Sequence, residues 1–188
     1  TIIATGREEL TIHPQLAPER FLKEAGVTLA RALESLLTAR LGAPRQVWCF
    51  LAAPFCAAQT RIIKIERERP VAITPVLVSE VLKAESERFK TENHNWFTND
   101  ADGENHRLFE SRILRIKLNG YQSADPYRQR ARQLEVINHF SLAGEKVLSQ
   151  FSAAATGVLH HNQIKFHSFL LAFYRVWQAL VGTDHSYL

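Results

Sequence analysis

The amino-acid sequence predicts an α+β protein. Short apolar or alternating segments, typical of strands, are interspersed with longer segments whose apolar residues recur at helical spacing. Of the 188 residues, 46% are hydrophobic and 22% are charged, so the composition is that of a globular chain that can bury a core.

The first part of the chain predicts a helix between two extended segments. Residues 2–13 are expected to be extended. A helix is expected over 18–41, because proline fits the first helical turn and apolar residues then form one stripe. The short apolar run 47–51 predicts a strand that is buried on both faces.

The next part predicts a strand and then a helix. Residues 60–66 are expected to form a strand, which is close enough in sequence to pair with 47–51 as a hairpin. Thr74 followed by Pro75 is a strong helix start, and the apolar stripe of that helix continues to Phe89. The polar residues 92–107 are predicted to be a loop.

Two further strands are predicted by alternation and by a turn. Residues 108–118 indicate a half-exposed strand. One side of that strand would carry Arg112, Leu114, Ile116 and Leu118. Asn119-Gly120 predicts a turn after it, and residues 132–140 indicate the second strand.

The last part predicts two helices separated by a short strand. Ser141 is expected to cap the first helix. Residues 163–166 are expected to form the strand. The helix Phe169–Val181 is apolar all round and should need cover on more than one side. Residues 186–188 resemble the start of another strand.

The basic residues give a net charge of +4 but are mostly mixed with acidic ones. The densest cluster is Arg128, Arg130 and Arg132, beside a predicted strand. A solvated surface is the expected interpretation. A free-standing module that binds nucleic acid through this cluster is the alternative, because such proteins concentrate basic charge in one place.

No catalytic, cofactor or metal residue is predicted. The two cysteines, Cys49 and Cys56, lie in an apolar run and have no metal-ligand spacing, which favours a reducing compartment. The histidines at 160, 161 and 167 do not match a zinc motif. The calcium-like loop 98–103 lacks its terminal carboxylate, because Phe109 occupies that position. An enzyme whose site forms only by convergence in space stays open.

Two segments are candidates for protein contact. Asn119, Tyr121 and Tyr127 lie in a polar, aromatic connection, and tyrosine offers contact area at little entropic cost. Arg61 and Lys64 lie on a predicted strand edge, where unpaired backbone groups recruit partners. Two ordinary turns would explain the aromatic connection equally well.

Three stretches of the sequence resemble a known family. Trp48-Cys49-Phe50-Leu51-Ala52-Ala53-Pro54-Phe55, Gln59-Thr60-Arg61 and Lys117-Leu118-Asn119-Gly120-Tyr121 are similar to bacterial actin-like ATPases, the group that includes the cell-division protein FtsA and the pilus-assembly protein PilM. His167-Ser168-Phe169 before an apolar helix also fits. The resemblance covers most of the chain, and its motifs are structural.

The resemblance implies a small strand–helix–strand–strand module inserted in part of an actin-like (ribonuclease-H-like) subdomain. Residues 1–58 would belong to the actin-like subdomain, 59–152 to the inserted module, and 153–188 to the return into the subdomain. The family's nucleotide-binding turns would lie outside this chain. ATP and Mg²⁺ are therefore expected only in a longer parent protein, which the absence of a starting methionine also favours.

The resemblance also implies a function. The chain would be a protein-interaction and assembly module in cell division or pilus assembly, not an enzyme in itself. Its partners would be neighbouring copies of the same protein or a component of the division or pilus machinery. Such a protein would be cytoplasmic and would meet the inner face of the cell membrane only indirectly, and nucleic acid is not its expected partner.

Overall fold

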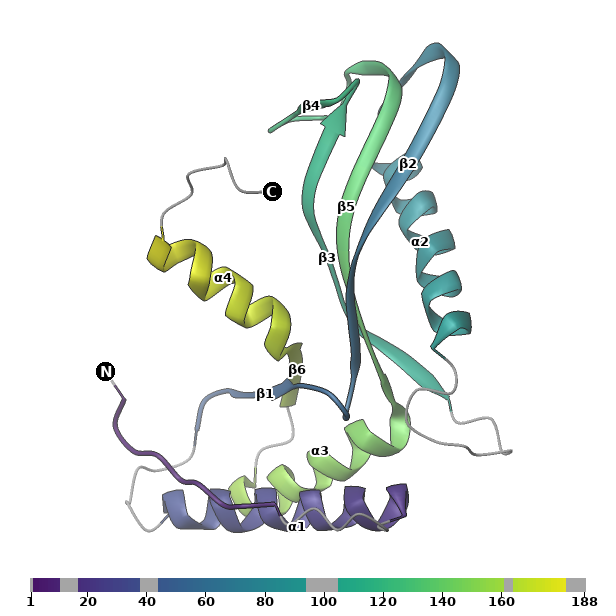
Figure 1. The fold of residues 1–188 in the computed structure, drawn as a ribbon. Coiled ribbons are helices and arrows are strands. Elements are labelled where there is room, and N and C mark those ends of the chain that lie inside the picture. Colours follow the sequence, from purple (N-terminus) through teal and green to yellow (C-terminus); the bar gives the residue numbers. More distant parts are fainter. Residues whose placement is uncertain (1, 11–16, 38–43, 94–104, 161–163, 182–188) are drawn as a thin grey trace.

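The structure, a computed structural model, has the expected α+β class and describes residues 2–10, 17–37, 44–93, 105–160 and 164–181. The elements are α1 (Pro18–Leu37), β1 (Val47–Leu51), β2 (Ala57–Ala72), α2 (Pro75–Glu92), β3 (His106–Leu118), β4 (Tyr121–Gln122), β5 (Arg130–Gly144), α3 (Glu145–Leu159), β6 (Ile164–Ser168) and α4 (Phe169–Val181). A long twisted sheet projects from a base in which α1 and α3 lie side by side (Figure 1).

The base is built on the parallel pair β1–β6, in which Val47 lies opposite Ile164. One face of this pair packs toward α1 and α3. The buried core there consists of Leu22, Ala25, Leu51, Cys56, Ala143, Val147, Leu148 and Phe151. The helical stripe predicted from Pro18 onward is confirmed, since Leu22 and Ala25 supply the buried side of α1, and this side packs chiefly on α3.

Two expectations about β1 are wrong. Trp48 is 56% exposed and Phe50 is 46% exposed, so only one face of the strand is buried. The strand also forms no hairpin with β2, because β2 pairs with β5 instead. A strand as long as β2 gains far more backbone hydrogen bonds from the long β5 than the short β1 can offer.

The projecting sheet is antiparallel, with the strand order β2-β5-β3-β4, and α2 covers one of its faces (Figure 1). Between helix and sheet lie two buried clusters. Their members are Ile73, Val78, Ile116, Leu118, Ala131, Leu134 and Val136 in one, and Ala57, Phe89, Phe140 and Leu142 in the other. Both β2 and β5 are longer than the segments predicted from sequence.

The predicted alternation in β3 is wrong in part. Ile116 lies opposite Val136, whereas Arg112 lies opposite His139 on the other face of the sheet. The register shifts between Ile113 and Arg115, and such a β-bulge reverses the side on which the following residues lie. A regular alternation through the whole segment could not allow for this extra residue.

Two local signals are confirmed. The backbone N–H of Leu77 donates to Thr74 Oγ1 at 3.1 Å, so Thr74 caps α2 as expected. Asn119 and Gly120 have φ values of 49° and 86° and form the turn between β3 and β4. Positive φ at both positions is the geometry of a two-residue hairpin turn, for which Asn-Gly is the preferred sequence.

Ser141 does not cap a helix, contrary to the prediction. It lies within β5, and α3 begins only at Glu145, with Gly144 as the N-cap residue. The Ser141 hydroxyl lies 3.1 Å from His139 Nε2 and is fully buried. The hydroxyl thus finds its partner two residues away on the same strand rather than at a helix start.

Helix α4 has the predicted bounds, and Ser168 caps it, because the Leu171 N–H donates to Ser168 Oγ at 3.3 Å. Of its side chains only Leu171 is fully buried. The described residues therefore do not provide the cover on several sides that was expected. Its exposed large apolar residues are Phe169, Leu170, Phe173, Val176, Trp177, Leu180 and Val181. The strand predicted at 186–188 and the loop 98–103 lie outside the described residues.

Within the described part of the chain, no helix combines the length and the apolar character needed to cross a membrane.

Candidate protein-contact surface

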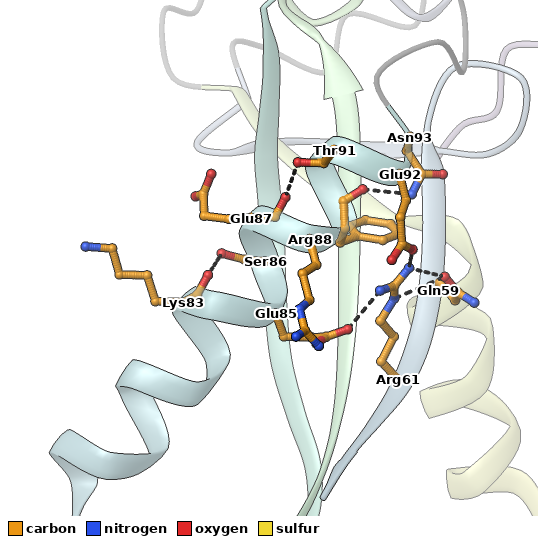
Figure 2. Close-up of polar contacts among 11 residues, drawn as sticks. Gln59, Arg61, Lys83, Glu85, Ser86, Glu87, Arg88, Thr91, Glu92 and Asn93 are labelled. Carbon is orange, nitrogen blue, oxygen red and sulfur yellow. Dashed lines mark hydrogen bonds and ion pairs between the residues drawn. The ribbon is translucent and has the colours of Figure 1, made fainter.

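Arg61 lies on β2 and points toward α2, where acidic residues hold it (Figure 2). Its Nη1 lies 2.8 Å from Glu85 Oε1, and its Nη2 donates to Glu92 and, at 3.1 Å, to Gln59 Oε1. The guanidinium carbon lies 5.0 Å from the centre of the Phe89 ring, a cation–π arrangement. Arg61 thus fastens α2 to the sheet.

The charges of this cluster reinforce one another. The hydrogen bond that Arg61 donates to Glu92 is the main cause that raises the pKa of Arg61, and the same bond lowers the pKa of Glu92. The side chain of Arg61 is only 14% exposed. Its guanidinium is therefore engaged within the molecule, not presented to a partner.

Lys64 lies on the opposite, open face of the projecting sheet. Its Nζ is 3.6 Å from Glu135 Oε2, and Lys117 Nζ is 2.9 Å from Glu135 Oε1. The hydrogen bond from Lys117 is the main cause that lowers the pKa of Glu135. The Lys64 side chain is 68% exposed, so this weakly held cation can reach a partner.

Asn119 and Tyr121 lie together at the β3–β4 hairpin. The Asn119 Oδ1 accepts hydrogen bonds from the backbone N–H groups of Arg132 and Gln133, which ties the hairpin to β5. Tyr121 is 81% exposed. The turn is thus fixed from inside while its tyrosine ring is free on the outside.

Tyr127 differs from Tyr121 in its surroundings. It is half-buried and packs against the core cluster of Ile73 and Leu134. The five predicted contact residues therefore do not form one patch: Arg61 lies under α2, Tyr127 supports the core, and Lys64, Asn119 and Tyr121 are presented by the sheet. Sequence alone could not separate the two tyrosines, because both stand in polar turns.

The arginine cluster lies at the start of β5. Arg128 has a positive φ of 69° and is exposed, whereas Arg130 donates from Nη2 to the Pro70 carbonyl oxygen at 3.0 Å. Arg132 is also exposed. One of the three side chains is thus used to hold the end of β2 in place.

A buried polar cluster between β5 and β6 was not predicted from the sequence. His139 Nε2 lies 3.3 Å from Ser168 Oγ and 3.1 Å from Ser141 Oγ, and His139 Nδ1 lies 3.1 Å from Thr60 Oγ1. Burial lowers the pKa of His139, although the charge of Glu110 acts in the opposite direction. The available signal was the polar series at 138, 139 and 141 inside an apolar strand.

Glu110 belongs to this region but does not bind His139. Its Oε1 lies 3.1 Å from His167 Nδ1, and its Oε2 accepts the backbone N–H of Ser168 at 2.9 Å. A serine–histidine–carboxylate relay would need the carboxylate to hold the imidazole that contacts the serine. These residues instead join the projecting sheet to the base.

Among the residues that the structure describes, no group of three or more His, Cys, Asp or Glu side chains is placed to hold a metal ion. Of the three histidines considered for zinc, His160 ends α3, His167 lies on β6, and residue 161 is outside the described residues.

No protein-family model matches this chain, and no curated protein matches it.

Proposed function

We propose that this chain is a protein-interaction and assembly module of an actin-like ATPase of the FtsA/PilM type, acting in cell division or pilus assembly. The observation that best supports the proposal is the projecting sheet. Its elements follow the order β2, α2, β3, β5, which is the strand–helix–strand–strand order of the module that the sequence resemblance implies. Its hairpin exposes a tyrosine to 81%.

In this proposal the end of the sheet makes the contact. Tyr121 and Lys64 meet a neighbouring copy or a component of the division or pilus machinery, and Asn119 holds the hairpin in its shape. Exposed tyrosines on a rigid support are frequent anchors of protein interfaces. ATP and Mg²⁺ belong to the longer parent protein, and the chain itself performs no chemistry.

Self-association of the chain tests the proposal. We expect concentration-dependent association by sedimentation velocity, and we expect Tyr121→Ala to weaken it about tenfold because an interface anchor is lost. Val76→Ala is the matched control, since Val76 is 65% exposed on α2, a separate surface. A chain that stays monomeric at every concentration would exclude a neighbouring copy as the partner, and an equal effect of both variants would contradict the contact at Tyr121.

The contact can also be mapped with a fluorescent label. Burial raises the pKa of Cys49 and of Cys56 to about 11, so both native thiols react slowly near neutral pH. An exposed cysteine from Tyr121→Cys is therefore labelled selectively. Its emission should change with protein concentration, whereas a label at Val76→Cys should not respond.

A further inference from the structure

A groove of about 530 Å³ lies over the open face of the β1–β6 sheet. The floor is formed by Trp48 and Phe50 from β1 and by Lys165 and His167 from β6, which alternate onto the same face of the parallel pair. The walls are formed by Arg112 from β3 and by Arg175 from α4. None of these residues belongs to the contact surface at the hairpin.

The groove carries positive charge that the described residues do not balance. Arg112, Lys165 and Arg175 come from three different elements, and none has an ion pair within the described part of the chain. Glu110 is the one carboxylate that lines the groove, so the three cations exceed it by two charges, and its oxygens already contact His167 Nδ1 and the Ser168 N–H. Bringing several cations together costs electrostatic energy, which a bound anion would offset.

The floor of the groove is aromatic. Trp48 and Phe50 are about half exposed, and their rings lie 6.0 Å and 5.7 Å from the His167 ring. Parallel strands are normally covered on both faces, whereas the residues that the structure describes leave the second face of this pair partly open. An occupant must therefore offer apolar or aromatic contact as well as negative charge.

We infer that the groove binds a segment of a partner protein in which acidic side chains flank an aromatic one. The carboxylates would meet Arg112, Lys165 and Arg175, and the aromatic ring would lie on Trp48 and Phe50. The inference goes beyond the proposed function, because it concerns a site separate from the hairpin. Nucleic acid fits less well, because its binders carry a continuous basic stripe, whereas the excess charge here is only +4 and mixed with acids.

A labelled random copolymer of glutamate and tyrosine is the probe, and fluorescence anisotropy is the measurement. We expect it to bind more tightly than polyglutamate, and to bind less tightly as salt rises. Arg112→Glu should weaken binding about tenfold, because it reverses a charge on the wall. Trp48→Ala should weaken binding of the copolymer but not of polyglutamate, because only the copolymer carries rings.

Arg132→Glu is the matched control, since it makes the same change in net charge at an exposed site outside the groove. Circular dichroism establishes that each variant is folded. Should Arg112→Glu fail to fold, the exposed Lys165→Gln addresses the same groove from β6.

Three results would overturn the inference. They are absent binding of the copolymer, equal losses in Arg112→Glu and Arg132→Glu, and tighter binding of a single-stranded oligonucleotide that displaces the copolymer. Self-association is measured on the same variants. Because Tyr121 lies outside the groove, the Arg112→Glu variant should self-associate like the wild type. Loss of copolymer binding with unchanged self-association would therefore concern the groove alone, and the proposed function would be tested separately.

Discussion

His139 is an imidazole buried in the middle of β5 and surrounded by the hydroxyl groups of Thr60, Ser141 and Ser168. Hydroxyl groups can either donate or accept, so they satisfy a neutral imidazole in either tautomer. They cannot balance a buried positive charge equally well. The site therefore favours the neutral form, and the stability of the fold depends on pH through this residue.

The first prediction follows from that dependence. Burial lowers the pKa of His139 below its ordinary value of 6.5, so the unfolded chain takes up the proton first as pH falls. The free energy of unfolding should therefore decrease on acidification below pH 6.5, by at most about 1.4 kcal/mol per pH unit, until the folded state is also protonated. Urea unfolding across this range measures the slope.

His139→Gln should remove most of that slope. His160→Asn is the control, because His160 is exposed and has a φ of 53°, which asparagine also adopts. The control should keep the slope of the wild type. An unchanged slope in His139→Gln would show that other groups govern the acid sensitivity.

Apolar contacts and ion pairs together hold helix α2 on its sheet. Val78 and Phe89 supply the buried apolar side chains, while Arg61 reaches from β2 to Glu85 and Glu92 on the helix. Arg61 also lies against the Phe89 ring, so its charge and its packing act on the same face of the helix. This arrangement makes Arg61 a stabilising residue of the sheet-helix unit.

The second prediction is that Arg61→Ala lowers the free energy of unfolding by about 1–2 kcal/mol, because Glu85 loses its closest partner in a half-buried position. Arg88→Ala is the control. Arg88 also faces Glu85, but at 3.8 Å and with a side chain that is 76% exposed, so its loss should cost less than about 0.5 kcal/mol. Equal costs in urea unfolding would argue against this role for Arg61.

At the same scale, sequence predicts elements whose signals are local. Thr74-Pro75 predicts a helix start and Asn119-Gly120 predicts a turn, each from two adjacent residues. Both predictions are confirmed. The pairing of strands that are distant in sequence has no comparable signal in adjacent residues. The β1–β6 pair, the bulge near Leu114 and the place of Ser141 in β5 depend on which distant strand lies alongside.

The projecting sheet and the base share elements. β2 begins where the base core ends, since Cys56 belongs to the base cluster and Ala57 to the sheet cluster. β5 leads from Phe140 in the sheet to Ala143 in the base. The resemblance implies domain boundaries after residues 58 and 152. The second boundary would fall inside α3, a helix that packs on α1 of the base.

The third prediction is that sheet and base unfold together. Val136→Ala empties part of the sheet core, where Val136 is fully buried, and should raise hydrogen exchange in α3 as well as in β5. Mass spectrometry of peptides from each element measures this. The exposed Ile62→Ala, on the same sheet, is the control and should change neither. Faster exchange confined to the sheet would mean that the two parts open independently.

The proposed contact surface was the part of the molecule that could be predicted least well from the sequence. Residue type identified Tyr121 and Tyr127 alike, and only the fold places one on the outside and one against the core. The groove on β1 escaped sequence analysis because its cations come from β3, β6 and α4, far apart along the chain.

The junction of β5 and α3 has a mechanical consequence. Gly144 ends the strand and Glu145 begins the helix, so no loop separates them, and the Glu145 N–H is held by the Asn105 carbonyl oxygen at 2.9 Å. A pull on the hairpin at Tyr121 reaches β5 through the β3–β5 pairing and the Asn119 hydrogen bonds, and β5 continues directly into α3 without a flexible joint. Because α3 packs on α1, a force applied at the far end of the sheet is transmitted to the helices of the base.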